Sequence, residues 1–151
     1  MDFNTPAQQA TYEKVNVLLK ELFGETGVFP SDERPSFLIP KGSAMTQIVI
    51  YPWRDDSATI CIRAYVVFGA EITPELMRFL LTENNDMRFG AFGLDSDGDI
   101  FFEYAIVGPS CDKEELKASV LAVAFVADDY DDKIVSRWGG QRAADRMTSQ
   151  G

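Results

Sequence analysis

Residues 88–108 read RFGAFGLDSDGDIFFEYAIVG, and this stretch decides the fold. Two apolar runs flank Ser96-Asp97-Gly98-Asp99, and Asp-Gly between apolar runs is a strong signal for a β-hairpin. A type I′ turn needs positive φ at both central residues, which glycine adopts freely and aspartate more readily than most residues. The stretch therefore predicts two antiparallel strands joined by a two-residue loop at Asp97-Gly98.

This loop fixes a register for the hairpin. It places Leu94 opposite Phe101 and Phe92 opposite Glu103, and small residues lie opposite large ones on the other face. A slip of one residue would exchange the two faces. An outward sheet face with so many apolar residues indicates an interaction surface, unless a helix covers each face within one monomer. We expect a partner-binding surface made of Phe92, Leu94, Phe101 and Glu103.

Helix signals lie on both sides of the hairpin. Two helices begin with threonine followed by proline, at Thr5-Pro6 and Thr73-Pro74. Asp112 caps a third helix, which runs to about Trp138. Apolar runs between the first two helices predict three more strands, at residues 36–40, 44–51 and 59–68. The order is therefore α-β-β-β-α-β-β-α.

Short turns between the strands make the five-stranded sheet mostly antiparallel, and the three helices complete a two-layer α+β fold. We expect a single domain over residues 1–140. Residues 141–151 have no strong period, so we expect a flexible C-terminal tail.

Composition excludes several classes of protein. Hydrophobic residues make up 46% of the chain, which excludes intrinsic disorder. The longest apolar run, residues 120–127, is too short to span a membrane, and the N-terminus has no signal-peptide pattern. Cys61 and Cys111 lack the spacing of metal ligands. We expect a cytoplasmic protein with two reduced thiols.

The charge distribution of the chain disfavours nucleic-acid binding. The net charge is −10, and residues 95–132 alone carry 11 acidic and 2 basic residues. Nucleic-acid binding needs a basic footprint, and the same acidic body disfavours anionic membranes. We therefore expect neither nucleic acid nor membrane among the partners.

No catalytic or cofactor motif is present. The chain has no histidine, so it holds no Ser-His-Asp relay, and its glycine-rich segments lack the ending of a P-loop. The Asp95–Asp99 segment lacks the spacing of a calcium-binding EF-hand loop and is explained by a turn. The four carboxylates of residues 128–132 suit a solvated helix face or a patch for a basic partner. We expect no enzyme activity, no cofactor and no metal.

The third predicted helix is apolar on two sides. Its core stripe consists of Leu116, Val120, Val123, Ala127, Tyr130 and Ile134. Leu121 and Phe125 lie on nearly the opposite side, and a helix that is apolar all round is usually buried on both sides. We expect a second copy of the chain or another layer of the sheet to cover Leu121 and Phe125.

The element order and two stretches carry a family resemblance. LLTENNDMRFGAFGLDSDGDIFFEYAIVG (residues 80–108) and VADDYDDKIVSRWGG (residues 126–140) resemble the YbjN-like proteins, which are similar in fold to the class I chaperones of type III secretion. The resemblance implies a cytoplasmic homodimeric α+β module without enzyme activity. It also implies an association with bacterial signalling, stress or chaperone-like roles.

These observations favour a non-enzymatic, homodimeric protein-binding module. Its acidic field predicts that the partner offers a basic or amphipathic segment. The alternative from another class is a regulator that binds a small ligand or a cation through the acidic turn and helix.

Overall fold

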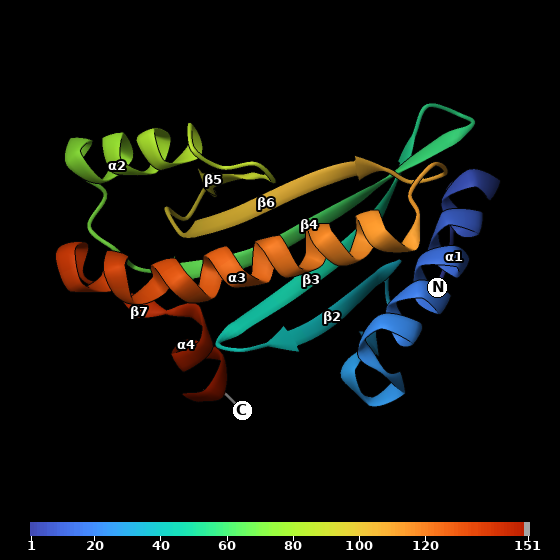
Figure 1. Cartoon of the computed structure of the whole chain (residues 1–151), viewed down its shortest axis with the longest axis horizontal. Helices are drawn as coiled ribbons and strands as arrows, with labels where there is room; N and C mark the ends of the chain where they lie inside the picture. The colour runs from blue at the N-terminus through green and yellow to red at the C-terminus, as the bar shows by residue number, and fades with distance from the viewer. Residues whose placement is uncertain (150–151) are drawn as a thin grey trace.

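One face of a seven-stranded antiparallel sheet carries three long helices, as Figure 1 shows for the computed structural model, which describes residues 1–149. The strand order is β1-β2-β3-β4-β6-β5, and β7 pairs with the end of β4. The strands are β1 (Phe29–Pro30), β2 (Ser36–Lys41), β3 (Ala44–Trp53), β4 (Ser57–Phe68), β5 (Ala91–Leu94), β6 (Ile100–Val107) and β7 (Gln141–Arg142). The helices are α1 (Pro6–Phe23), a 3-10 turn (Glu25–Gly27), α2 (Pro74–Asn84), α3 (Lys113–Trp138) and α4 (Ala143–Ser149).

The predicted α+β class is confirmed, and the five predicted strands and three predicted helices are present. The predicted counts are too low, because the described residues add two short strands, β1 and β7, and a fourth helix, α4. The capping residues act as the sequence indicates. The hydroxyls of Thr5 and Thr73 accept the backbone N–H three residues on, and the Asp112 carboxylate accepts that of Glu115 at 2.7 Å. These caps satisfy N–H groups that the first turn of a helix leaves without a backbone partner.

The core lies between the sheet and α1, α2 and α3. The alternating residues of β4 that face the helices, Ile60, Ile62 and Ala64, are fully buried, as is the predicted core stripe of α3 except for the half-buried Tyr130. Tyr12 of α1 stacks on Phe37 of β2, with ring centroids 4.7 Å apart. α2 packs against α3, where the rings of Phe79 and Trp138 lie 5.2 Å apart. All three long helices therefore cover the same face of the sheet.

Regular structure continues past residue 140. Gln141 and Arg142 pair with Phe68 and Val67 of β4, and α4 follows directly. In Figure 1 α4 lies beside the turn that joins β2 to β3. The end of the long α3 helix is therefore not the end of the folded chain, and residues 150–151 of the predicted tail lie outside the described residues. No helix within residues 1–149 combines the length and the apolar character needed to cross a membrane.

The hairpin register differs from the predicted one by one residue. Phe92 lies opposite Phe102 and Leu94 opposite Ile100, so the loop has five residues, 95–99. Gly98 has φ +81°, whereas Asp97 does not adopt the positive φ that a type I′ turn requires.

Asp95 determines this turn. Its carboxylate accepts the backbone N–H of Asp97 and of Asp99, at 2.9 and 3.0 Å, and its carbonyl accepts that of Gly98 at 3.0 Å. An aspartate that binds the backbone two residues on favours a four-residue turn, and a glycine with positive φ then returns the chain to the sheet.

Candidate functional site

The corrected register divides the predicted partner-binding surface. Phe92 is buried among the helix-facing residues, where its ring meets those of Phe102 and Tyr130 at 5.0 and 5.1 Å. Leu94 shares that side of the hairpin and is partly exposed at its rim. Phe101 and Glu103 point to the opposite face of the sheet. The prediction that all four share one outward face is therefore wrong, and only Phe101 and Glu103 remain together.

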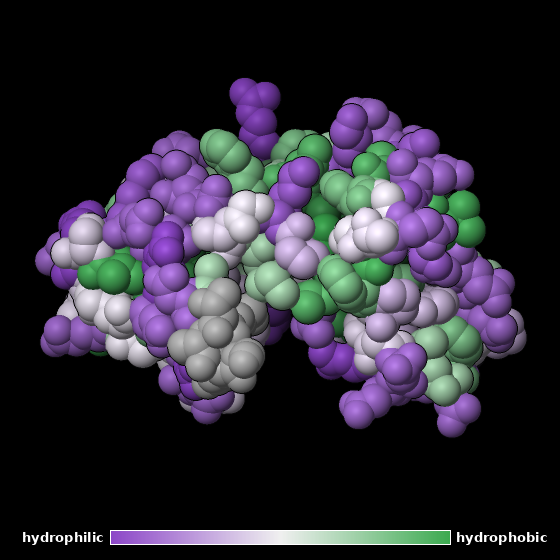
Figure 2. All heavy atoms as spheres, turned by 90° about the horizontal axis from the view of Figure 1, so that it is seen from below, coloured by the Kyte–Doolittle hydropathy of each residue, from purple (hydrophilic) through white to green (hydrophobic). Residues whose placement is uncertain are grey.

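The face of the sheet opposite the long helices is open. One cross-strand row on it runs from β2 to β5 through Leu38, Gln47, Arg63, Glu103 and Ala91. None of these five residues is buried, whereas the neighbouring row on the helix-facing side is packed in the core. We call this face of the sheet the open face. Figure 2 views the molecule from below, another side, where apolar residues reach the surface between hydrophilic ends.

Three aromatic residues form a strip on the open face. Tyr65 stacks on Phe68 with a centroid distance of 5.2 Å, and it meets Phe101 edge-on at 6.1 Å. The ring of Phe101 lies across Gly93 of β5, where a Cβ atom would come within 2.5 Å of it. Glycine at 93 is therefore what lets this large ring lie against the edge strand. We call Phe68, Tyr65 and Phe101 the aromatic strip.

Polar residues continue the strip at its β6 side. The Arg63 guanidinium lies 3.7 Å from the ring centroid of Phe101 and donates to the Glu103 carboxylate at 2.9 Å. The Cys61 thiol donates to the same carboxylate oxygen at 2.7 Å. Burial, with this hydrogen bond and the negative charge of Glu103, raises the pKa of Cys61 to about 12. Cys61 is therefore a neutral hydrogen-bond donor here, not a reactive thiolate.

The second cysteine is equally unreactive. Cys111 is buried beside the start of α3, and burial raises the pKa of its thiol to about 11. Both cysteines are free, as the sequence indicated.

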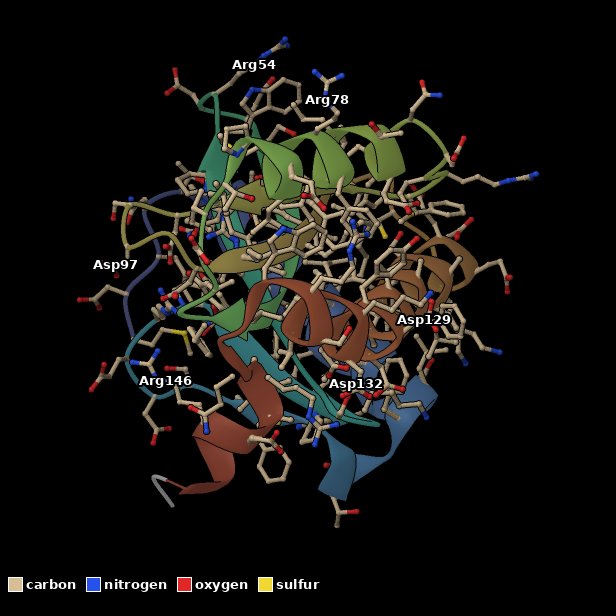
Figure 3. All side chains as sticks on the ribbon, turned by 90° about the vertical axis from the view of Figure 1, so that its left-hand side faces the viewer. Arg54, Arg78, Asp97, Asp129, Asp132 and Arg146 are labelled. Carbon is tan, nitrogen blue, oxygen red and sulfur yellow. The ribbon has the colours of Figure 1, made fainter. Side chains whose placement is uncertain are left out.

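Carboxylates of the hairpin loop border the aromatic strip. The Tyr65 hydroxyl donates to Asp95 at 2.8 Å, and the N–H of Gly69 donates to Asp99 at 3.1 Å. Hydrogen bonds from the Asp99 N–H and from Tyr65 hold the pKa of Asp95 below its usual value. In Figure 3 Asp97 points away from the molecule on the side opposite Asp129 of α3. The strip therefore has an acidic border.

Calcium should bind this loop only at millimolar concentrations or above. Carboxylate oxygens of Asp95, Asp97 and Asp99 can come within 4.8 Å of one another, but calcium takes 6–8 oxygen ligands in a strong site. Both oxygens of Asp95 already accept hydrogen bonds. Calorimetry with calcium chloride tests this expectation. A micromolar site that is lost in Asp97→Asn would contradict it.

The acidic turn of α3 is partly structural. The Ser43 hydroxyl contacts the carboxylates of both Asp128 and Asp131, and Asp132 pairs with Arg142 at 3.6 Å. Asp131 is only 3% exposed, and its burial raises the pKa of its carboxyl. These contacts hold the β2–β3 turn and β7 against α3. Asp131 therefore does not belong to the solvated helix face that was one of the two interpretations of these carboxylates.

Exposed apolar residues gather where α2 meets β5. A shallow pocket of about 220 Å³ is lined by Met77, Leu80, Leu81, Phe92, Gly93 and Leu94. Leu81 is 70% exposed, Met77 40% and Leu94 37%. We call these three residues the α2–β5 patch. A group of large apolar side chains left in water at one place indicates an interaction site.

The edge strand beside this patch has its backbone capped. The Asn84 side chain accepts the N–H of Phe92 at 2.6 Å and donates to the carbonyl of Phe92 at 3.3 Å. Asn84 thus takes the place of a neighbouring strand at the middle of β5.

The predicted dimer residues lie on the solvent side of α3. Phe125 is 70% exposed, and Leu121 is half-buried. Both line a pocket of about 310 Å³ that also includes Lys41 and Gly42 of the β2–β3 turn. The pair therefore offers a small apolar surface with one prominent ring.

Sequence reasoning missed Arg63, Tyr65 and Phe68 as members of the open face. The available signal was the mixed polar and apolar face of the third predicted strand, at Cys61, Arg63 and Tyr65. That signal gave no indication that Phe101, almost forty residues later, would lie against them.

Comparisons with known proteins identify relatives. Residues 9–146 match a family model described as TY-Chap1, the T3SS (YopN, CesT) and YbjN peptide-binding chaperone 1. A chain of the crystal structure titled "Crystal Structure of the ExsC-ExsE Complex" is similar with a TM-score of 0.62 and 21% identity. The alignment covers 82% of this chain and 95% of that one, and it shows a shared fold. None of the curated proteins matches in sequence.

Proposed function

We propose that this chain, which belongs to the TY-Chap1 family of peptide-binding chaperones, binds a segment of a partner protein on its open face. The observation that carries this proposal is the aromatic strip. Phe68, Tyr65 and Phe101 are half-buried and lie on a sheet face that the long helices leave uncovered. Aromatic rings bury a large area with little loss of conformational freedom, so they anchor binding surfaces well.

The bound segment is either extended, with basic and apolar residues in alternation, or amphipathic, with its apolar residues on one face. Its apolar side chains would lie on the strip and supply most of the affinity. Its basic side chains would meet the acidic border at the hairpin loop and the wider negative field of the chain, whose net charge is −10. Such a field sets the association rate and the preferred sign of the partner.

The chaperone acts as a homodimer in this proposal, and the α2–β5 patch is the surface that meets the second copy. Three large apolar side chains are exposed there, Leu81, Met77 and Leu94, whereas on α3 Phe125 is exposed and Leu121 is half-buried. A two-fold contact uses the same patch on both copies, so one apolar cluster serves both sides. The pair on α3 is the alternative contact, and the same experiment tests it.

Withholding or presenting a partner segment needs no chemistry, so the proposed function is non-enzymatic. The resemblance to YbjN-like proteins supports a cytoplasmic location. Regulation in bacterial signalling or stress, which the resemblance to YbjN-like proteins implies, would follow from release of the segment. The cation-binding alternative would require the strong calcium site whose absence is predicted above.

A peptide array tests the proposed function. We expect selection of basic amphipathic or extended peptides and rejection of acidic ones. Titration of a selected peptide at about 0.05 M and about 0.3 M salt should show moderate weakening, because screening shortens the reach of surface charges to about 6 Å at the higher salt. Selection of acidic peptides, or no binding at all, would overturn the proposal.

A further inference from the structure

An arginine of the chain itself lies on one end of the aromatic strip. The guanidinium carbon of Arg146, on α4, is 4.5 Å from the ring centroid of Phe68. At the other end Arg63 lies over Phe101. Figure 3 shows Arg146 on the same side of the molecule as Asp97, away from Asp129 and Asp132. Two cations of the chain therefore occupy the two ends of the surface proposed for the partner.

The two arginines are held in different ways. Arg63 belongs to the central strand β4, and its guanidinium makes an ion pair with Glu103 and hydrogen-bonds it through Nε at 3.0 Å. Its side chain is 31% exposed. Arg146 is exposed and belongs to the short helix α4, which two residues of β7 connect to the sheet. Arg63 is thus part of the sheet, whereas Arg146 reaches Phe68 from a helix outside the sheet.

The chemistry around Phe68 favours a cation over its ring. The neighbouring loop brings Asp99, which accepts the N–H of Gly69, and Asp95, which accepts the Tyr65 hydroxyl. A cation over an aromatic face beside carboxylates is attracted by both. Arg146 fills this position with a group that a basic partner segment would also bring.

We propose that Arg146 is an internal occupant of the binding surface, which an arginine or lysine of the partner segment replaces on Phe68. This inference rests on the proposed function, and it names the side chain that the segment places at this end of the strip. Because Arg146 must be displaced, it lowers the affinity for a basic segment. Its removal should raise that affinity about two- to five-fold, the range for a cation over an aromatic ring at an exposed site.

The probe is the synthetic peptide acetyl-(Leu-Arg)4-amide, titrated against the full chain by calorimetry or fluorescence anisotropy. Arg146→Gln should bind it about two- to five-fold more tightly than the wild type. Loss of any cation makes the chain more acidic, so a charge-matched control is needed. Arg54→Gln supplies it, because Arg54 lies 4.4 Å over the ring of Trp53, beyond the aromatic strip at the β3–β4 turn. Equal effects of the two substitutions would overturn the inference.

A double-mutant cycle with Phe68→Leu tests whether the effect of Arg146→Gln on affinity depends on the Phe68 ring. In that background Arg146→Gln should no longer change the affinity, since the shared partner is gone. An unchanged gain in that background would also overturn the inference. If the probe binds through Phe101 but Arg146→Gln has no effect, this inference fails and the proposed function stands. Binding to neither the wild type nor Arg146→Gln would overturn both.

Discussion

Phe101→Ser should weaken the binding of a basic amphipathic peptide by about five- to thirty-fold, which corresponds to about 1–2 kcal/mol. Full burial of a large apolar side chain contributes about 1.5–3 kcal/mol, and Phe101 is already half-buried before a peptide arrives. The ring also supports its neighbours, since it meets Tyr65 edge-on and carries the Arg63 guanidinium. Serine removes the apolar area and leaves both neighbours without their contact.

The contrast with Glu103 separates apolar from electrostatic binding. Glu103→Gln keeps an acceptor for Arg63 and Cys61 and removes only the charge. It should cost about 0–1 kcal/mol, because surface ion pairs contribute little. Titration of the same peptide with both variants measures the difference. An effect of Glu103→Gln larger than that of Phe101→Ser would show that charge and not apolar contact dominates.

Two controls make the Phe101 result interpretable. Val17→Ser removes an apolar side chain that is 56% exposed on α1, away from the open face, and it should leave the affinity unchanged. Phe101→Leu keeps most of the apolar area and should bind with intermediate affinity. Thermal unfolding of each variant shows whether the fold persists. A folded Phe101→Ser protein that binds as tightly as the wild type would exclude the aromatic strip.

Met77→Asp combined with Leu81→Asp should convert the proposed dimer into a monomer of 16.8 kDa. Both side chains are exposed, at 40% and 70%, so aspartate should be tolerated by the folded monomer. A two-fold contact loses four apolar side chains at once and gains four like charges around its axis. At about 1.5 kcal/mol for each lost side chain, the dissociation constant should rise roughly ten-thousand-fold.

Sedimentation velocity at several protein concentrations measures this change. Phe125→Asp is the control, because Phe125 is 70% exposed on α3 and the substitution likewise replaces an exposed apolar side chain by a carboxylate, with one added charge per copy against two in the double variant. We expect Phe125→Asp to remain dimeric. A monomeric Phe125→Asp protein beside a dimeric Met77→Asp/Leu81→Asp protein would place the contact at Leu121 and Phe125, as the sequence suggested. A wild type that is monomeric at all concentrations would exclude the homodimer.

The helices and strands could be predicted because their signals are local. Threonine followed by proline, the Asp112 cap and the alternation along β4 each lie within one element, and each is confirmed. The register of the hairpin could not be predicted in the same way. Asp-Gly suits both a two-residue loop and a longer turn that ends in glycine, and the choice rests on the Asp95 carboxylate. Because the Asp95 carboxylate selects the longer turn, Phe92 lies in the core and not on the predicted surface.

The candidate site depends on contacts between distant segments. Phe101 and Arg63 come from strands almost forty residues apart, and Arg146 reaches Phe68 from a helix that has no strong period. A mixed face on one strand does not reveal which strand will lie beside it. Likewise, nothing local in the sequence shows that all three long helices cover one face and leave the other open.

The side-chain amide of Asn84 limits how further copies of the chain can add to the edge strand β5. An edge strand with unsatisfied N–H and C=O groups is a template on which further chains can add and grow into fibrils. At Phe92 both groups are already satisfied by Asn84, within a strand of only four residues. A second copy that approaches β5 must therefore join through side chains rather than by extending the sheet. In the proposed homodimer, assembly at this edge would therefore stop at a closed pair and would not continue into a polymer.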